Sequence, residues 1–181
     1  FTGPNRSFEM QFMNPVIFWI PEMVNNSTGD GNGMLYGGMK YTFKSISLWS
    51  ELLIDDYILV INDWGGSPEP NSIGYSFGLE TNGKSGNTLN VIFEYTAIRN
   101  RTYQALKYEE IYTHRGFPVG HYLGNDFELI QLALRKNKIL KKNINPNLFI
   151  SYLRDGANSL STPFDEPWIE VGPSYTESFP T

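Results

Sequence analysis

The chain has no cysteine among its 181 residues and no apolar run of the length that a membrane-spanning helix needs. Without cysteine, disulfides and thiolate metal sites are excluded. The net charge is -5, and no basic stripe with interleaved aromatic residues is present, so we expect no binding to nucleic acid. There is also no signal peptide where the chain opens at Phe1, and we expect a mature fragment or an incomplete chain.

What the sequence does have is alternation of apolar and polar residues. In Ser72–Glu80 every second residue is large and apolar, and the residues between are small or polar. The pattern returns in Thr88–Ala97, where only Ile92 breaks it. Because successive side chains of a strand point to opposite faces, each segment predicts a strand with one apolar face. The short turn at Asn82 and Gly83 joins them as a hairpin.

The same reasoning along the whole chain predicts eight strands. We place them at residues 7–14, 34–43, 46–57, 72–81, 88–98, 127–135, 147–155 and 167–172. The links within hairpins are short, whereas the segments between hairpins are long, at residues 15–33, 58–71, 99–126 and 156–167. Such alternation is typical of outer-membrane barrels, which have short periplasmic turns and long extracellular loops. The pattern alone leaves a half-buried sheet of a soluble β-sandwich as an equal alternative.

Three stretches carry a resemblance to a known family. Met13–Pro15 closes the first expected strand, Ser50–Tyr57 is a strand that ends in paired aspartates, and Thr113–Asp126 is a glycine-punctuated loop that leads into a strand. In this order they resemble the capsule-assembly protein Wzi family of Gram-negative bacteria. The chain departs from the family pattern at Val119–His121, where the family has Leu-Gly-His, and at Phe127, where a small or acidic residue is common.

The resemblance covers most of residues 7–155 and implies an all-β fold, an antiparallel transmembrane β-barrel in the bacterial outer membrane. It also implies a lectin-like rather than enzymatic role, with surface polysaccharide as the partner. Because a barrel in lipid cannot have an open edge, about eight strands do not make a complete wall. We therefore expect residues 1–181 to be a single segment from the C-terminal part of a larger barrel, completed by missing strands or by other chains.

The candidate ligand-binding residues are polar or aromatic and lie at a strand end or in the long loops. They are Asp55, Asp56, Trp64, His114, Arg115, His121 and Asp126. The paired aspartates suit a cation or sugar hydroxyls, although a solvated strand end with a capping carboxylate is an alternative. Trp64 lies between acidic residues, as in many carbohydrate sites, but a tryptophan of an interfacial girdle fits the same pattern.

The segment His114–Asp126, at the end of the long loop 99–126, is predicted to fold inward or across the barrel mouth. Its glycines at 116, 120 and 124 allow close approach or positive φ, and they would place Arg115, His121 and Asp126 near a polar lumen. There Arg115 would donate hydrogen bonds to carboxylates of an anionic polysaccharide. A loop that only packs on neighbouring loops is the alternative. The two histidines lack the spacing of a helical zinc motif, so we expect no metal and no cofactor.

These observations predict an outer-membrane barrel that binds or anchors surface polysaccharide or has a structural role. Its apolar face, which includes Phe77 and Phe93, is expected to contact outer-membrane lipid. Two alternatives from other classes remain, a soluble carbohydrate-binding β-sandwich and a glycoside-processing enzyme. The enzyme would use two carboxylates, and Glu109 and Glu110 are one such pair. No nucleophile elbow is present, and we predict no catalytic residue.

Overall fold

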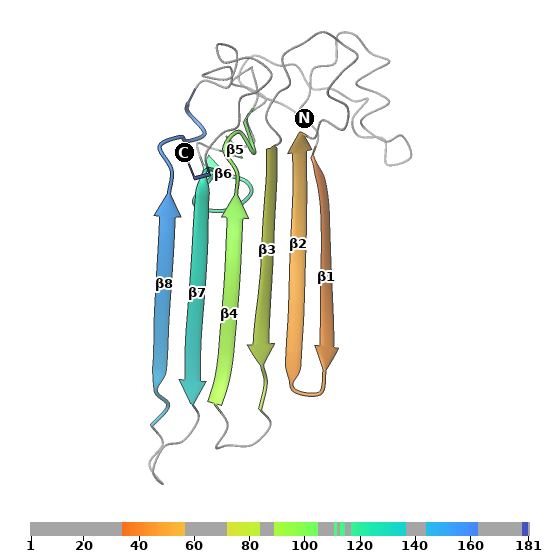
Figure 1. Cartoon of the computed structure of the whole chain (residues 1–181), viewed down its shortest axis with the longest axis vertical. Helices are drawn as coiled ribbons and strands as arrows, with labels where there is room; N and C mark the ends of the chain where they lie inside the picture. Colours follow the sequence, from red (N-terminus) through yellow and green to blue (C-terminus); the bar gives the residue numbers. More distant parts are fainter. Residues whose placement is uncertain are drawn as a thin grey trace.

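The computed structural model describes residues 34–56, 72–83, 89–104, 111, 113–114, 117–136, 144–162 and 179–180. Within these residues the chain is all-β, and six strands form one antiparallel sheet in the order β1-β2-β3-β4-β7-β8 (Figure 1). The strands are β1 (Leu35–Phe43), β2 (Ile46–Asp56), β3 (Ser72–Thr81), β4 (Leu89–Ile98), β7 (Phe127–Lys136) and β8 (Asn147–Asp155). Two short strands, β5 (Thr113–His114) and β6 (Phe117–Pro118), pair separately.

The sheet confirms the predicted all-β, antiparallel fold. Six of the eight expected strands are present, each with bounds within one residue of those predicted. The first and the eighth, at residues 7–14 and 167–172, lie outside the described residues. No helix of the described part of the chain is long and apolar enough to cross a membrane.

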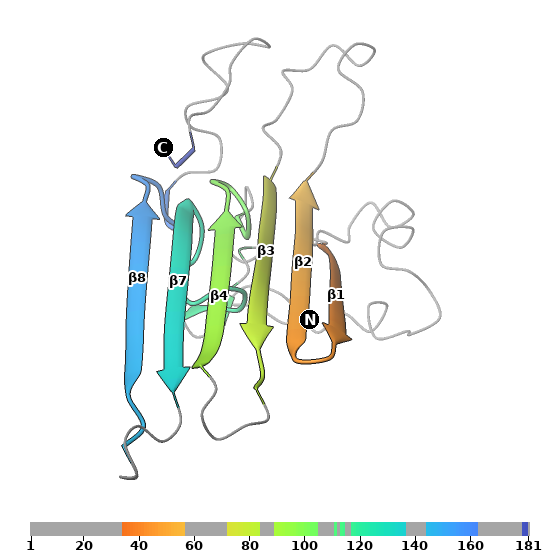
Figure 2. The same cartoon turned by 60° about the horizontal axis from the view of Figure 1, so that its bottom comes forward.

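Neighbouring strands of the sheet follow one another along the chain, so the links between them alternate between its two ends. The short links 44–45, 82–88 and 137–146 join strands at one end. The long links 57–71 and 99–126 leave from the other, which we call the loop end (Figures 1 and 2). The described parts of 99–126 therefore start and finish at the loop end.

The register of the sheet places most of the large apolar strand residues on one face, which we call the outer face. Its large residues are Leu35, Met39, Tyr41, Phe43, Ile46, Leu48, Leu52, Ile54, Ile73, Tyr75, Phe77, Leu79, Leu89, Val91, Phe93, Tyr95, Ile130, Leu132, Leu134, Leu148, Ile150 and Tyr152. Many are open to the surroundings; Met39 is 70% exposed and Tyr152 is 58% exposed. A continuous apolar surface of this kind marks a contact with lipid or with another protein.

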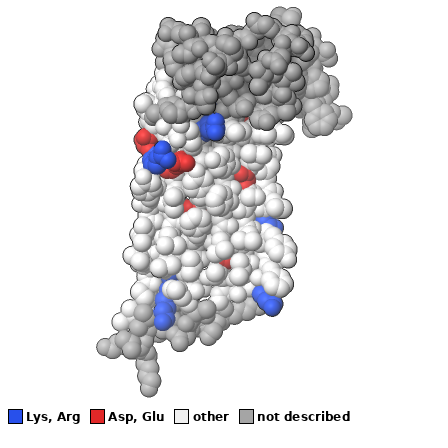
Figure 3. All heavy atoms as spheres, in the orientation of Figure 1, with Lys and Arg blue, Asp and Glu red and all other residues white. Residues whose placement is uncertain are grey.

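Charged groups of the outer face lie near the ends of the strands. At the loop end, Arg154 pairs with Glu128 at 2.7 Å, and the Tyr95 hydroxyl donates to the other oxygen of Glu128 at 2.7 Å. At the opposite end of β7 lies Lys136. In Figure 3 the larger charged patches lie toward the two ends of the strands, and the surface between them is mostly of other residues with a few small charged patches.

The opposite face of the sheet, the inner face, carries polar side chains along its middle and a small apolar core at the loop end. The core consists of Ile98, Tyr103, Phe127 and Leu129, which are buried where the described residues of segment 99–126 cover the sheet. Leu53, Leu123, Leu160 and Met34 pack against it. The hydrophobic core of the described residues thus lies beneath the loops, while the outer face of the sheet is left uncovered.

Candidate functional site

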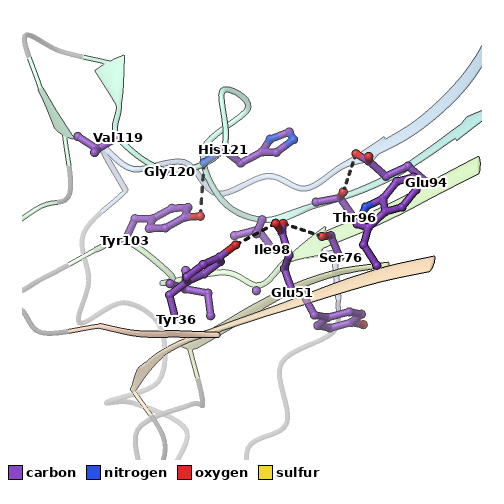
Figure 4. A pocket seen from close by; sticks show the side chains of 14 residues that line it. Tyr36, Glu51, Ser76, Glu94, Thr96, Ile98, Tyr103, Val119, Gly120 and His121 are labelled. Carbon is purple, nitrogen blue, oxygen red and sulfur yellow. Dashed lines mark hydrogen bonds between the residues drawn. The ribbon is translucent and has the colours of Figure 1, made fainter. Parts of the chain in front are cut away.

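A pocket of about 640 Å³ lies on the inner face, next to the loops. One wall is formed by inner-face side chains of β1 to β4, and the other by Tyr103, Val119, Gly120 and His121 of segment 99–126 (Figure 4). The volume falls in the range of about 300–1,000 Å³ that small-molecule sites have. These four loop residues and the polar face of the sheet therefore enclose a space of ligand size.

Glu51 of β2 is held in the strand wall of this pocket. One of its carboxylate oxygens accepts a hydrogen bond from the Tyr36 hydroxyl at 2.8 Å, and the other accepts one from Ser76 Oγ at 3.0 Å. The donors belong to the two strands on either side of β2, so the carboxylate is fixed from both sides. Further along the inner face, Glu94 of β4 accepts a long hydrogen bond from Thr96 Oγ1 at 3.5 Å.

Trp49 lies on the sheet beside these carboxylates and lines the same pocket. Its cross-strand partner on β3 is Gly78. A Cβ placed on Gly78 would overlap three consecutive atoms of the indole ring, Cε2, Cζ2 and Cη2. All three ring atoms lie close to the position of that Cβ. A face of the ring, rather than its edge, therefore covers the glycine. Only a residue without a side chain permits this arrangement.

The loop wall is positioned by Tyr103, which has φ of 72°. Its backbone N–H donates to Asp55 Oδ2 at 2.7 Å, so the carboxylate at the end of β2 fixes a residue 48 positions later in the chain. The Tyr103 ring packs so closely on Gly120 that a Cβ at Gly120 would overlap it. The Tyr103 hydroxyl also accepts a hydrogen bond from the backbone N–H of His121 at 3.4 Å.

His121 stands at the loop side of the pocket as a half-buried, neutral imidazole. Its ring packs against Tyr122 and Phe127, with centroid distances of 4.5 and 4.6 Å. Nδ1 accepts a hydrogen bond from the backbone N–H of Leu123 at 3.2 Å, which requires that nitrogen to be unprotonated. Burial lowers the pKa of His121 below its ordinary value, because the charged form loses its hydration.

Asp126 is fully buried behind the pocket and ties the loop to the segment that follows β8. Its Oδ2 accepts a hydrogen bond from the backbone N–H of Asn158 at 3.1 Å, and its carbonyl accepts one from Gly156 N–H at 2.7 Å. Gln104 adds a second tie, because its Nε2 donates to the Ser159 carbonyl at 2.6 Å. The loop wall is therefore braced from several directions.

The seven candidate ligand-binding residues predicted from the sequence differ in their position relative to the pocket. His121 lines the pocket, whereas the carboxylates of Asp55 and Asp126 hold backbone amides behind it. Trp64, Arg115 and the side chains of Asp56 and His114 lie outside the described residues. The ligand-binding role of all seven stays a prediction. Among the described residues, no group of three His, Asp or Glu side chains is placed to hold a metal ion.

Sequence reasoning did not single out Trp49, Glu51 or Tyr103. The first two are two residues apart in the segment 46–57, and this spacing places them on the same face of a strand. That signal marks a face of the sheet but not which polar residues of other strands lie beside them. Tyr103 has no local signal, since its position depends on Asp55 in another strand.

Comparison with known proteins gives one match. The family model of capsule assembly protein Wzi matches residues 1–159, which include every strand of the sheet and all residues that line the pocket. No curated protein and no solved structure matches the chain. The matched family is one of outer-membrane β-barrels, and an antiparallel sheet with an apolar outer face is consistent with part of such a barrel. The chain belongs to the capsule assembly protein Wzi family.

Proposed function

We propose that this chain forms part of an outer-membrane barrel with a role in capsule assembly, and that its loop-side pocket binds the surface polysaccharide. One observation carries the proposal. The sheet has an uncovered apolar outer face and, at the loop end of the opposite face, a pocket whose lining includes fixed carboxylate and hydroxyl groups. In this proposal the outer face of the strands contacts lipid, and the inner face of the same strands contacts the sugar.

The length of the apolar region supports the membrane part of the proposal. On β7, the outer face runs from Glu128 to Lys136 with Ile130, Leu132 and Leu134 between them. Eight residue steps span about 26 Å along a strand. At a strand tilt of about 40°, this corresponds to about 20 Å across the membrane, close to the apolar band of about 25 Å in outer-membrane barrels.

The position and chemistry of the pocket support the polysaccharide part. Long loops of outer-membrane barrels are extracellular, so a pocket at the loop end lies toward the cell surface, where capsule is found. Its wall presents the carboxylates of Glu51 and Glu94 with the hydroxyls of Tyr36, Ser76 and Thr96 (Figure 4). Such groups accept from and donate to sugar hydroxyls. In this proposal, Asp55 and Asp126 shape the pocket by holding its loop wall.

The absence of cysteine from the chain allows a direct test. Ser76→Cys places a thiol in the pocket, and Glu80→Cys places one on the same strand and face but outside the pocket lining. Each variant is purified in detergent, labelled with a bulky maleimide, checked for complete labelling by mass spectrometry, and tested for binding to surface polysaccharide isolated from the producing cells. Labelling of Ser76→Cys is expected to abolish binding, whereas labelling of Glu80→Cys leaves it unchanged.

Three other results would contradict the proposal. Unchanged binding by completely labelled Ser76→Cys would remove the pocket as the polysaccharide site. A protein that stays folded and monodisperse without detergent would support the soluble β-sandwich. Shortening of the polysaccharide during incubation would support the glycoside-processing enzyme.

A further inference from the structure

We infer that the pocket takes an uncharged pyranose unit of the polysaccharide, stacked on the ring of Trp49, with its hydroxyls bound by Glu51 and Glu94. The inference rests on the proposed function, since it names the sugar class that the same pocket would accept. It depends on three features of the described residues: a flat aromatic ring, two carboxylates beside it, and the absence of cationic side chains from the lining.

The ring of Trp49 is presented as a flat surface. One of its faces covers Gly78, because a Cβ added to that glycine would overlap three ring atoms. Trp49 also lines the pocket and is partly exposed, so we assign the sugar to the ring face that is turned away from the sheet. The face of an aromatic ring is electron-rich, and the C–H groups on one face of a pyranose carry partial positive charge. A pyranose laid on this ring would direct its hydroxyl groups outward, around the edge of the ring.

Two carboxylates lie beside the edge of the Trp49 ring. Glu51 lies two residues beyond Trp49 on the same face of β2, and Glu94 is the β4 partner of Gly78. Each oxygen of an ionised carboxylate has two acceptor sites, and the hydrogen bonds from Tyr36 and Ser76 use one on each oxygen of Glu51. The remaining acceptor sites of this fixed group suit neighbouring sugar hydroxyls.

The charge of the lining favours an uncharged sugar. Glu51 and Glu94 are the charged residues of the described lining, and it contains no lysine or arginine. A uronate or phosphate group would meet two negative charges in a partly enclosed space, where charge repulsion is stronger than in bulk water. The cation nearest to Trp49 by register is Lys40, its partner on β1, which is exposed and does not line the pocket. Among the described residues, Lys40 is thus the cation closest to a uronate bound at Trp49.

The test compares neutral and anionic oligosaccharides of equal length. Isomalto-, galacto- and manno-oligosaccharides serve as neutral probes and oligogalacturonate as the anionic probe, with affinity measured by titration calorimetry on the detergent-purified protein. At least one neutral probe is expected to bind at least tenfold more tightly than oligogalacturonate. Trp49→Leu and the double variant Glu51→Gln with Glu94→Gln should each weaken that binding at least tenfold. Glu80→Gln, outside the pocket, should leave it within twofold.

Gly78→Ala provides a second test of the stacking surface. This variant retains the Trp49 side chain but fills the space over which its ring lies. The added methyl group should displace the ring and weaken neutral-sugar binding at least tenfold. The matched control is Gly37→Ala on β1, where an added Cβ meets nothing within 4 Å. Heat-modifiable migration on gels shows whether each variant has folded. If the folded Gly78→Ala and Trp49→Leu variants bind as wild type does, the inference is overturned.

The remaining outcomes separate the inference from the proposed function. Tighter binding of oligogalacturonate that is lost in Lys40→Gln would overturn the uncharged-sugar inference and leave polysaccharide binding intact. Binding of the native polysaccharide with no binding of any neutral probe would do the same. No binding of the native polysaccharide would overturn the proposed function itself.

Discussion

Leu132 occupies the position on β7 where a charge on the outer face should be most costly. It lies four residues from Glu128 and four from Lys136, the charged residues near the two ends of the strand. Its cross-strand neighbours on the outer face, Phe93 and Ile150, are both apolar. If these residues contact lipid, the side chain of Leu132 lies near the middle of the hydrocarbon layer.

The expected cost follows from this position. Arginine on the lipid face near the midplane of an outer-membrane barrel costs about 2–4 kcal/mol. That is a decrease of roughly 30- to 700-fold in the folding equilibrium, at about 1.4 kcal/mol per factor of ten. The neighbouring residue Gln131 points to the inner face, where its cross-strand partner is Glu94. Gln131→Arg therefore places the same charge in a polar setting, beside a carboxylate, and should cost little.

The free energy of unfolding of both variants is measured by equilibrium denaturation of the protein refolded in lipid vesicles, with the folded fraction read from gel migration. Leu132→Arg should be destabilised by about 2–4 kcal/mol relative to wild type. Ile130→Arg, two residues closer to the Glu128–Arg154 pair, should be destabilised by less. Equal stability of Leu132→Arg and Gln131→Arg would refute the assignment of the outer face to lipid.

Three further predictions concern the loops. Gly120→Ala should destabilise the docked loop by about 1–3 kcal/mol, because the added methyl group overlaps the Tyr103 ring. The control Gly37→Ala should not destabilise the loop. Limited proteolysis of the loop compares the two variants. The loop should be most stable above about pH 6.5 and lose stability as the pH falls below that value toward the lowered pKa of His121, since the unfolded loop then binds the proton more readily. Hydrogen exchange against pH would show this loss, and His121→Gln should remove it. Protease added to intact cells should cut within the long loops; cleavage at Lys138, in a short link, would reverse the proposed orientation.

The sequence by itself determined the strands and their two faces. Alternation of apolar and polar residues has a period of two and is written locally, so each of the six described strands could be placed to within one residue. Link lengths, together with the antiparallel order, then predicted which loops share an end of the sheet. The ordered motifs at Asn14, Asp55 and His121 were enough to identify the family, although each motif is short.

Only the tertiary structure decided which residues form the pocket. Trp49 lies on Gly78 because the register of β2 on β3 pairs them, and register depends on the whole sheet rather than on either strand. The sequence marked Asp55 as a candidate ligand-binding residue, whereas its carboxylate in the fold holds the backbone of Tyr103. That contact joins residues 48 positions apart, and no pattern within either segment encodes it. A loop is placed by such distant partners, so its function could be suspected from the sequence but its geometry had to come from the fold.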